Sequence, residues 1–304
     1  MTLLTTDAAL HALEPEWAAL WSRSTATPFQ HPAWLLPWWD AFGTASARVA
    51  TVRQGGRLVG VLPLYELPSK MLPIGAGITD YQDALLDPAV DATETLLENA
   101  VRGAALPLHL IDLPPWSRLR TAPIEGWRGE AVGSDPCPVL DPAQCHPRQL
   151  RKLRMSRNRA DRAGGWSVEV ATTDTAAAMF ESLRELHSAR WRGEGVLADP
   201  AVLAFHRAAL PRLLVAGLLW LCALRIGGTV AAVIYALRDP HRVLFYISGH
   251  YDARAFESPG TLLLGWMLEN AGGRMAHFLR GAEGYKYAWG ATDAFNAQRI
   301  LTRA

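Results

Sequence analysis

The sequence predicts an α/β protein with mixed sheets, built from two tandem domains of similar size. The chain has 304 residues, half of them hydrophobic, so one large core or two smaller cores can form. A Gly-Gly hairpin signal occurs at Gly55-Gly56 and again at Gly227-Gly228, 172 positions later. A helix and a strand follow each hairpin, and this repeated order indicates a duplicated α/β unit. We therefore place one domain at 1–140 and a second at 141–304.

The composition excludes several classes of protein. Thirty basic residues balance 29 acidic ones, and a net charge of +1 argues against a general nucleic-acid coat protein. Three cysteines without a CxxC spacing argue against a disulfide framework, so a reducing, cytoplasmic location is expected. The N-terminus has no secretory signal pattern, and the longest apolar run, 213–224, is shorter than the roughly 20 residues of a membrane span. The nine histidines do not cluster at ligand spacing, so no metal site is expected.

Two helices are predicted ahead of the first hairpin. Apolar residues recur at helical spacing over Thr6–Ser22, which predicts one continuous helix. Ala33–Phe42 carries three of the chain's tryptophans, Trp34, Trp38 and Trp39, on adjacent faces of a second helix. Tryptophan suits both a core and the wall of a cleft, and this helix fits either.

Each Gly-Gly pair lies between two apolar runs that predict the strands of a hairpin, and a β-helix-β passage follows each hairpin. The predicted elements of the first half are the strands Arg48–Arg53 and Leu58–Tyr65, the helix Ala89–Arg102 and the strand Leu108–Asp112. Those of the second half are the strands Leu219–Arg225 and Val230–Leu237, the helix Thr261–Asn270 and the strand Met275–Leu279.

A proline-rich segment and a basic helix lie at the junction of the two halves. Gly133–Pro147 contains four prolines, which disfavour helix and strand, and predicts the linker. Arg148–Arg162 has seven cations against one acid, Asp161, and predicts a basic helix. Its face is either simply solvated or bound to an anion, because arginine binds phosphate bidentately. The candidate partners are cofactor phosphates, an acidic substrate, an acyl-carrier protein or a transfer RNA.

The second half contains a candidate anion site. Val243–Gly249 predicts a central strand, and Ser258-Pro259-Gly260-Thr261 predicts the start of the following helix. Exposed backbone N–H groups and the positive end of a helix dipole bind anions, and Arg254 lies nearby in the sequence. The alternative is an ordinary helix cap.

A second candidate cluster follows the last predicted strand of this half. Phe278–Gly290 places Glu283, Lys286 and three aromatic residues at a strand end, where ligands of α/β folds bind. Glu283 could accept a proton from an attacking amine, or it could pair with Lys286 in a buried ion pair.

Together, these motifs resemble the GNAT superfamily of acyltransferases. The most similar subgroup has tandem domains, is related to Fem-type peptidyltransferases and is described as cellulose-biosynthesis-like acetyltransferases. The resemblance spans about residues 27–300 and rests on Thr27–Trp34, Asp80-Tyr81, the basic helix, His187–Trp191, Ser258–Thr261 and Arg280–Gly290. It implies two GNAT-like domains and transfer of an acyl group from a thioester, usually acyl-CoA, to an amine by direct attack in a cleft between the domains.

The resemblance also implies roles for individual residues. By this resemblance, the residues expected to bind the phosphates and the acyl arm of the cofactor are Tyr246, Ser248, Arg254, Ser258, Gly260 and Thr261. The candidate catalytic residues are Glu283, Asp80 and His187. Binding of the acceptor falls to Tyr81, Arg190, Trp191, Tyr285, Lys286 and Trp289. The family's Arg-Gly-Asp-Glu-x-Tyr-Lys pattern has Ala282 in place of the aspartate, which makes Glu283 the stronger carboxylate candidate.

Two other functions remain open at this level. The first is a Fem-like transferase that uses an aminoacyl-tRNA donor, which the basic helix favours and the neutral net charge opposes. The second is a non-catalytic binding protein with the same fold, which Ala282 favours. The acceptor could be a small-molecule amine, a peptide side chain or a sugar.

Overall fold

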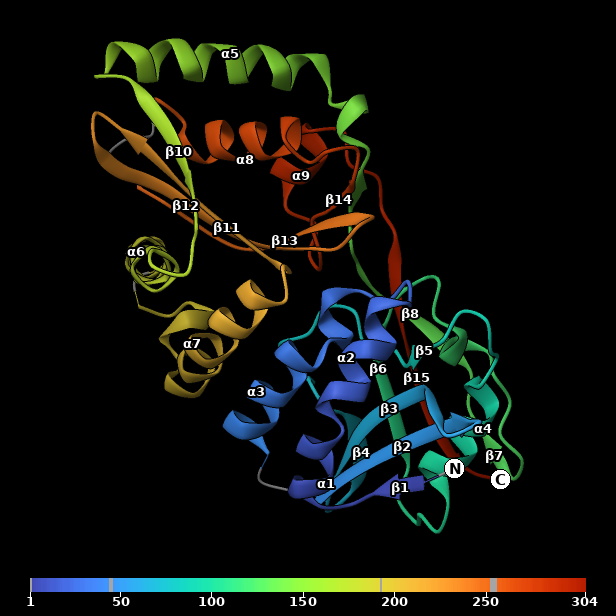
Figure 1. Cartoon of the computed structure of the whole chain (residues 1–304). Helices are drawn as coiled ribbons and strands as arrows, with labels where there is room; N and C mark the ends of the chain where they lie inside the picture. The colour runs from blue at the N-terminus through green and yellow to red at the C-terminus, as the bar shows by residue number, and fades with distance from the viewer. Residues whose placement is uncertain (1, 44–45, 192, 252–255) are drawn as a thin grey trace. The chain divides into compact units, whose positions relative to one another are not determined.

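The protein forms two compact α/β units, which we describe from a computed structural model. The structure describes residues 2–43, 46–191, 193–251 and 256–304. Unit 1 comprises Met1–Pro136 and Phe295–Ala304, and unit 2 comprises Cys137–Ala294. Each unit contains one mixed sheet, which confirms the predicted fold class (Figure 1). The predicted boundary lay near residue 140 and assigned the C-terminus to the second domain, whereas the last strand lies in the sheet of unit 1.

Unit 1 is a sheet in the order β1-β2-β3-β4-β6-β15-β7, with β5 beside β3 and β8 beside β15. Its strands are β1 (Thr2–Leu4), β2 (Ser46–Gln54), β3 (Arg57–Leu67), β4 (Lys70–Pro73), β5 (Leu85–Leu86), β6 (Leu108–Leu113), β7 (Trp127–Arg128), β8 (Ala131–Pro136) and β15 (Phe295–Arg303). Its helices are α1 (Asp7–Ala12), α2 (Glu14–Ser22), α3 (Pro32–Phe42) and α4 (Thr93–Val101).

The first predicted helix is interrupted. Instead of one helix over Thr6–Ser22, α1 ends at Ala12 and α2 begins at Glu14. Pro15 occupies the first turn of α2, where its missing N–H is tolerated, but it cannot continue the hydrogen bonds of α1. The tryptophan-rich helix α3 forms as predicted and is buried in unit 1, with Trp34 Nε1 donating to Thr79 Oγ1 at 2.8 Å.

Both predicted hairpins are present. β2 pairs with β3, and β11 (Leu219–Ile226) pairs with β12 (Thr229–Arg238), in antiparallel register. The turn glycines have φ values of +58° and +81° at Gly55 and Gly56, and +56° and +79° at Gly227 and Gly228. Two successive positive φ values are characteristic of a type I′ turn, which explains why both hairpins carry Gly-Gly.

Unit 2 is a sheet in the order β10-β11-β12-β13-β14-β9. Its other strands are β9 (Val139–Leu140), β10 (Trp166–Val170), β13 (Arg242–His250) and β14 (Met275–His277). Its helices are α5 (Pro147–Arg162), α6 (Ala176–Arg190), α7 (Pro200–Val215), α8 (Pro259–Glu269) and α9 (Gly284–Ala288). Helix α8 packs on one face of the sheet with α5 against it, and α6 covers the other face (Figure 1).

The proline-rich segment between the halves is more ordered than a linker. It contains β8, which pairs with β15 in unit 1, and β9, which pairs with β14 in unit 2. Proline is tolerated at strand ends and sheet edges, so Pro136 can end β8 without disrupting a central strand. None of the helices in the described part of the chain combines the length and the apolar character that crossing a bilayer requires.

Candidate functional site

A cavity of about 330 Å³ opens in unit 2 where β13 and β14 separate. These two strands are parallel but pair only along Arg242–Leu244 and Met275–His277. Beyond Leu244, within the described residues, this edge of β13 has no strand beside it and lines the cavity as far as His250. A free strand edge presents backbone N–H and C=O groups, so the cavity offers hydrogen bonds along its length.

A β-bulge decides which side chains of β13 face the cavity. The register with β12 shifts between Tyr235 and Ala236, which pair with Ile247 and Phe245, so Tyr246 is the extra residue. Tyr246 packs its ring against Tyr235 and His206, on the side of the sheet that α6 covers.

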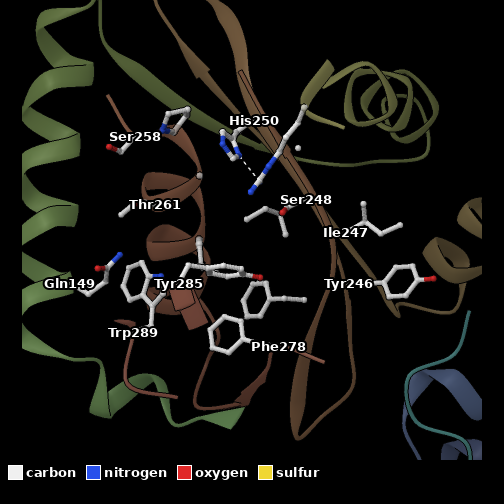
Figure 2. Close-up of a pocket in the computed structure, with 18 residues that line it drawn as sticks. Gln149, Tyr246, Ile247, Ser248, His250, Ser258, Thr261, Phe278, Tyr285 and Trp289 are labelled. Carbon is white, nitrogen blue, oxygen red and sulfur yellow. Dashed lines mark hydrogen bonds between the residues drawn. The ribbon is translucent and has the colours of Figure 1, made fainter. Parts of the chain in front are cut away.

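After the bulge, the alternation of β13 resumes in a shifted phase. Ser248 and His250 lie opposite Ile234 and Ala232, two core residues of the face that α8 covers. They therefore face α8, whereas Tyr246 and Ile247 point away from it (Figure 2).

The start of α8 forms one end of the cavity. Ser258 occupies the N-cap with φ +53° and ψ +59°, and its side chain makes no capping hydrogen bond. Pro259 has no N–H, and the backbone N–H groups of Gly260 and Thr261 lie in the first turn, where a helix offers them no internal partner. A Cβ added to Gly260 would have Nδ1 of His250 as its nearest neighbour, at 3.5 Å. This helix start is therefore open toward the cavity and suited to an anion.

Arg190 brings a positive charge to the same end. It is the last residue of α6, and its Nη1 lies 3.2 Å from Nδ1 of His250 (Figure 2). Helix α6 can reach this position because it passes close to β13 at Gly249. A Cβ built on Gly249 would lie 2.9 Å from Cβ of Leu186, so only a glycine allows this approach. Among the described residues, the lining of the cavity contains the Arg190 guanidinium and no carboxylate.

Aromatic side chains close the opposite end of the cavity. Phe278 stacks on Phe245 with ring centroids 5.5 Å apart, and Tyr285 meets Phe278 edge-on at 6.2 Å. Tyr285 is 48% exposed as a residue, but desolvation around its hydroxyl raises its pKa to about 12. Glu283 acts in the same direction and Arg190 in the opposite one. Tyr285 therefore keeps its proton at neutral pH and offers a hydrogen-bond donor.

His187 lies beside the cavity rather than in its lining. It is 6% exposed, packs against Trp191, and its Nδ1 has no hydrogen-bond partner within the described part of the chain. Gly195 packs directly against the His187 ring, and a Cβ built on Gly195 would clash with Cε1 of His187. Burial, and to a lesser degree Arg190, lowers the pKa of His187, so the ring is neutral at pH 7.

Glu283 and Lys286 form an ion pair at 2.8 Å. Lys286 is 2% exposed, and its Nζ also donates to the backbone carbonyls of Leu279, Arg280 and Gly281 at 2.9–3.1 Å. The lysine thus holds the loop before α9, whereas the Glu283 side chain is 58% exposed. Neither residue lines the cavity.

Asp80 and Tyr81 belong to unit 1. Tyr81 is fully buried, where its ring meets those of Phe29 and Trp116 edge-on. The backbone carbonyl of Asp80 accepts a hydrogen bond of 2.7 Å from Asn296 Nδ2 on β15. Both residues are thus tied into the core and sheet of unit 1.

The structure brings together about half of the residues selected from the sequence. Those that line the cavity are Tyr246, Ser248, Ser258, Gly260, Thr261, Arg190, Tyr285 and Trp289. Those that lie elsewhere are Glu283, Asp80, His187, Tyr81, Trp191 and Lys286. Arg254 lies outside the described residues. Gln149 and His250 also line the cavity but were not predicted from the sequence, since a lone glutamine on a basic helix and a histidine at a strand end carry no motif.

The described residues contain no group of three or more His, Cys, Asp or Glu side chains arranged to hold a metal ion.

Comparison with known proteins identifies a domain within unit 2. Residues 147–287, from α5 to α9, match the family model described as the acetyltransferase (GNAT) domain. Unit 2 carries a GNAT domain. The matched segment contains most of the lining of the cavity, and the acyltransferase character and the GNAT resemblance inferred from the motifs are confirmed. No curated protein matches the chain.

Solved structures share the fold over the whole chain. FemX has a TM-score of 0.66 and 11% identity, with 99% of this chain and 97% of FemX covered. A conserved protein of unknown function from Bacteroides thetaiotaomicron has a TM-score of 0.64 and 12% identity, with 99% and 100% covered. The C-terminal domain of a putative lysylphosphatidylglycerol synthetase from Agrobacterium fabrum has a TM-score of 0.61 and 11% identity, with 97% and 92% covered. At these identities the likeness concerns the fold alone, and it includes both units.

Proposed function

We propose that the GNAT domain transfers an acyl group from an acyl thioester, with acyl-CoA as the first candidate, to an amine. One observation carries the proposal: the free edge of β13 leads, within one cavity, to the open start of α8. An acyl-CoA has the complementary order of groups, with a thioester, two amides and a diphosphate along one chain. Strand edges pair with amides, and helix starts bind phosphates.

The phosphates of the donor would lie at the start of α8. The N–H groups of Gly260 and Thr261 would donate to phosphate oxygens, and the Arg190 guanidinium would add charge from the other side of His250. Ser248 and Ser258 line the same end and offer hydroxyl groups. The thioester would then lie farther along β13, near the bulge at Tyr246.

The reaction would be a direct displacement at the thioester carbonyl. The amine nitrogen forms a bond to the carbonyl carbon, the tetrahedral oxyanion accepts N–H donors from the edge of β13, and the C–S bond then breaks. The leaving thiolate takes a proton from solvent, or from the Tyr285 hydroxyl, which then regains a proton from water because its pKa is raised to about 12. The amine proton passes to a base or to water.

Three residues selected from the sequence are the candidates for the base that accepts the amine proton. In unit 2, Glu283 is an exposed carboxylate paired with Lys286, and His187 is a neutral imidazole beside the cavity. Asp80 of unit 1 is the third candidate.

The test is donor binding followed by turnover. Calorimetry with CoA and acetyl-CoA measures binding, and release of free thiol in the presence of a panel of amines, with intact-mass detection of the acylated amine, measures transfer. We expect binding and amine-dependent thiol release. If neither binding nor thiol release is observed, the proposed function is wrong. Binding without any turnover would favour a non-catalytic binding protein.

A second candidate donor follows from the surface of α5. Arg148, Arg151, Lys152 and Arg162 lie on one exposed side of this helix, and among the described residues none of them has an acidic partner. By contrast, Arg157 pairs with Glu269, and Arg159 donates to the carbonyl of Phe256, which precedes α8. A polyanionic donor carrier, either a transfer RNA or an acyl-carrier protein, would fit such a side.

Charge reversal separates this candidate from acyl-CoA. The double variant R151E/K152E should leave binding of free CoA unchanged if the phosphates lie at α8. It should abolish binding of a carrier that docks on α5. Tight binding of deacylated tRNA to the unmodified protein, with a steep dependence on salt and loss in the double variant, would favour the aminoacyl-tRNA donor over acyl-CoA.

A further inference from the structure

Two buried polar side chains line the cavity without a hydrogen-bond partner among the described residues. Gln149, on α5, is 6% exposed, and Trp289, which directly follows α9, is 1% exposed. Both line the cavity, and neither makes a side-chain hydrogen bond within the described part of the chain. Figure 2 draws both among the side chains that line the cavity.

Their surroundings give no reason for these polar groups. The lining also contains the apolar side chains of Leu264 and Phe278, and Trp289 packs within the apolar core of unit 2. A polar group in such a lining is stabilised by a hydrogen-bond partner. Neither Nε1 of Trp289 nor the amide of Gln149 is among the side-chain atoms that are sealed from solvent and lack one, so both can reach a partner in the cavity. Other unpartnered groups of the chain, such as Trp38 Nε1, are sealed from solvent. Gln149 and Trp289 differ because they border a space in which a ligand can supply the partner.

The hydrogen-bonding chemistry of the two side chains limits the class of ligand that can pair with both. The indole Nε1–H of Trp289 only donates, whereas the carboxamide of Gln149 both donates and accepts. A secondary amide matches this pair, since its carbonyl oxygen accepts from the indole and its N–H donates to Oε1 of Gln149. A hydrocarbon segment would leave both side chains unpaired.

We propose that Gln149 and Trp289 form a subsite that binds an amide of the thioester donor. The inference rests on the proposed function and deepens it. It adds two side chains that bind the donor to the edge of β13 and the start of α8. The amide has two possible sources, the pantetheine arm that every acyl-CoA carries or an acyl group that itself contains an amide.

The test compares two variants with matched controls. Gln149→Leu keeps the size of the side chain and removes its hydrogen bonds, and Trp289→Phe removes the indole N–H. Gln298→Leu, on the exposed side of β15 in unit 1, repeats the first change away from the cavity. Trp266→Phe, on α8 against the same core, repeats the second change outside the lining. Because Trp289→Phe also removes core volume, Gln149→Leu is the decisive variant.

Three probes distinguish the sources of the amide. Calorimetry gives the Kd of CoA, of pentanoyl-CoA and of N-acetylglycyl-CoA, whose acyl groups have the same chain length but differ by one amide. If the subsite binds the pantetheine arm, Gln149→Leu weakens all three probes by about three- to tenfold, the effect of one lost hydrogen bond. If it binds the acyl group, only N-acetylglycyl-CoA is weakened.

Two outcomes would overturn the inference and are distinguishable from each other. Unchanged Kd values for all three probes in Gln149→Leu would overturn the subsite and leave the proposed function intact. Failure of the unmodified protein to bind any of the probes would overturn both.

Discussion

Nη1 of Arg190 lies 3.2 Å from Nδ1 of His250, so a guanidinium from α6 meets the end of β13 beside the start of α8. A hydrogen bond in this direction requires an imidazole that accepts at Nδ1 and carries its proton on Nε2. Arg190 also influences two titratable groups on opposite sides of it. It lowers the pKa of His187 and acts against the rise in the pKa of Tyr285. One cation thus links the anion site to both candidate proton-transfer groups.

Replacing Arg190 should shift the pH dependence of the reaction if His187 is the base. Removing the positive charge in Arg190→Gln raises the pKa of His187, so the acidic limb of kcat/KM for the amine moves to higher pH. The measurement is a pH–rate profile between about pH 5 and pH 9. Arg184→Gln, on the same helix but paired with Glu181, serves as the control. An acidic limb that stays in place would exclude His187 as the base.

Lys286 and Glu283 should affect different properties of the protein. Lys286→Met leaves the carbonyls of Leu279, Arg280 and Gly281 without their shared donor, and we expect a loss of about 2–4 kcal/mol in the free energy of unfolding. Glu283→Gln removes an exposed partner and should cost less than about 1 kcal/mol.

Denaturant unfolding measures the stability of both variants, and turnover of a confirmed amine measures their activity. If Glu283 is the base, Glu283→Gln loses activity while remaining as stable as the unmodified protein. Equal stability of the two variants would show that the buried ammonium does not support the loop.

Gly260→Asp should have opposite effects on folding and on donor binding. An aspartate in the first turn of α8 interacts favourably with the helix dipole, by about 0.3–1 kcal/mol, and the site has room for a Cβ. The same carboxylate occupies the anion site and repels phosphate, so the Kd for CoA should rise more than about tenfold. Thermal unfolding and calorimetry measure the two effects. Gly133→Asp, at an exposed position of unit 1 with open space around it, is the control. Unchanged CoA binding in Gly260→Asp would mean that the phosphates do not bind at the start of α8.

Asp83 of unit 1 should make stability depend on pH. Its carboxyl group is desolvated, which raises its pKa to about 7 despite hydrogen bonds from Ser117 and from the N–H of Ala84. The folded state therefore holds this proton at pH values where the unfolded chain, with a pKa of 3.8, has lost it. Because the folded state then binds more protons, stability falls as the pH rises from about 4 to 7.

Asp83→Asn removes this titrating carboxyl group, so the decline in Tm between about pH 4 and pH 7 should become smaller than in the unmodified protein. Asp135→Asn, at an exposed position of β8, is the matched control. An identical decline in Asp83→Asn and the unmodified protein would mean that the carboxyl group is not desolvated in solution.

The features that the sequence predicted correctly depend on local signals. The two Gly-Gly turns require positive φ at successive residues, and the basic helix and the start of α8 carry proline and glycine at their ends. The break between α1 and α2 was also a local signal, carried by Pro15, but regular apolar spacing on both sides obscured it.

The features that the sequence did not predict depend on contacts between distant segments. Strand β15 pairs with β6 and β8 of unit 1, although almost the whole of unit 2 separates it from them in the chain. No local pattern distinguishes a strand that returns to an earlier sheet from one that extends the nearest sheet. For the same reason, Gln149 of α5 could not be assigned to the cavity before the packing of α5 against α8 was known.

The sequence by itself predicted the fold class, the turns and the helix starts from residue types at short spacing. It predicted the GNAT character through the resemblance of its ordered motifs to that family. The tertiary structure alone decided which of these residues share a cavity. The bulge at Tyr246 turns Ser248 and His250 toward α8, and the close approach of α6 at Gly249 brings Arg190 to them. Both depend on strand register and helix packing, and a one-residue shift in register moves every side chain of a strand to the other face of its sheet.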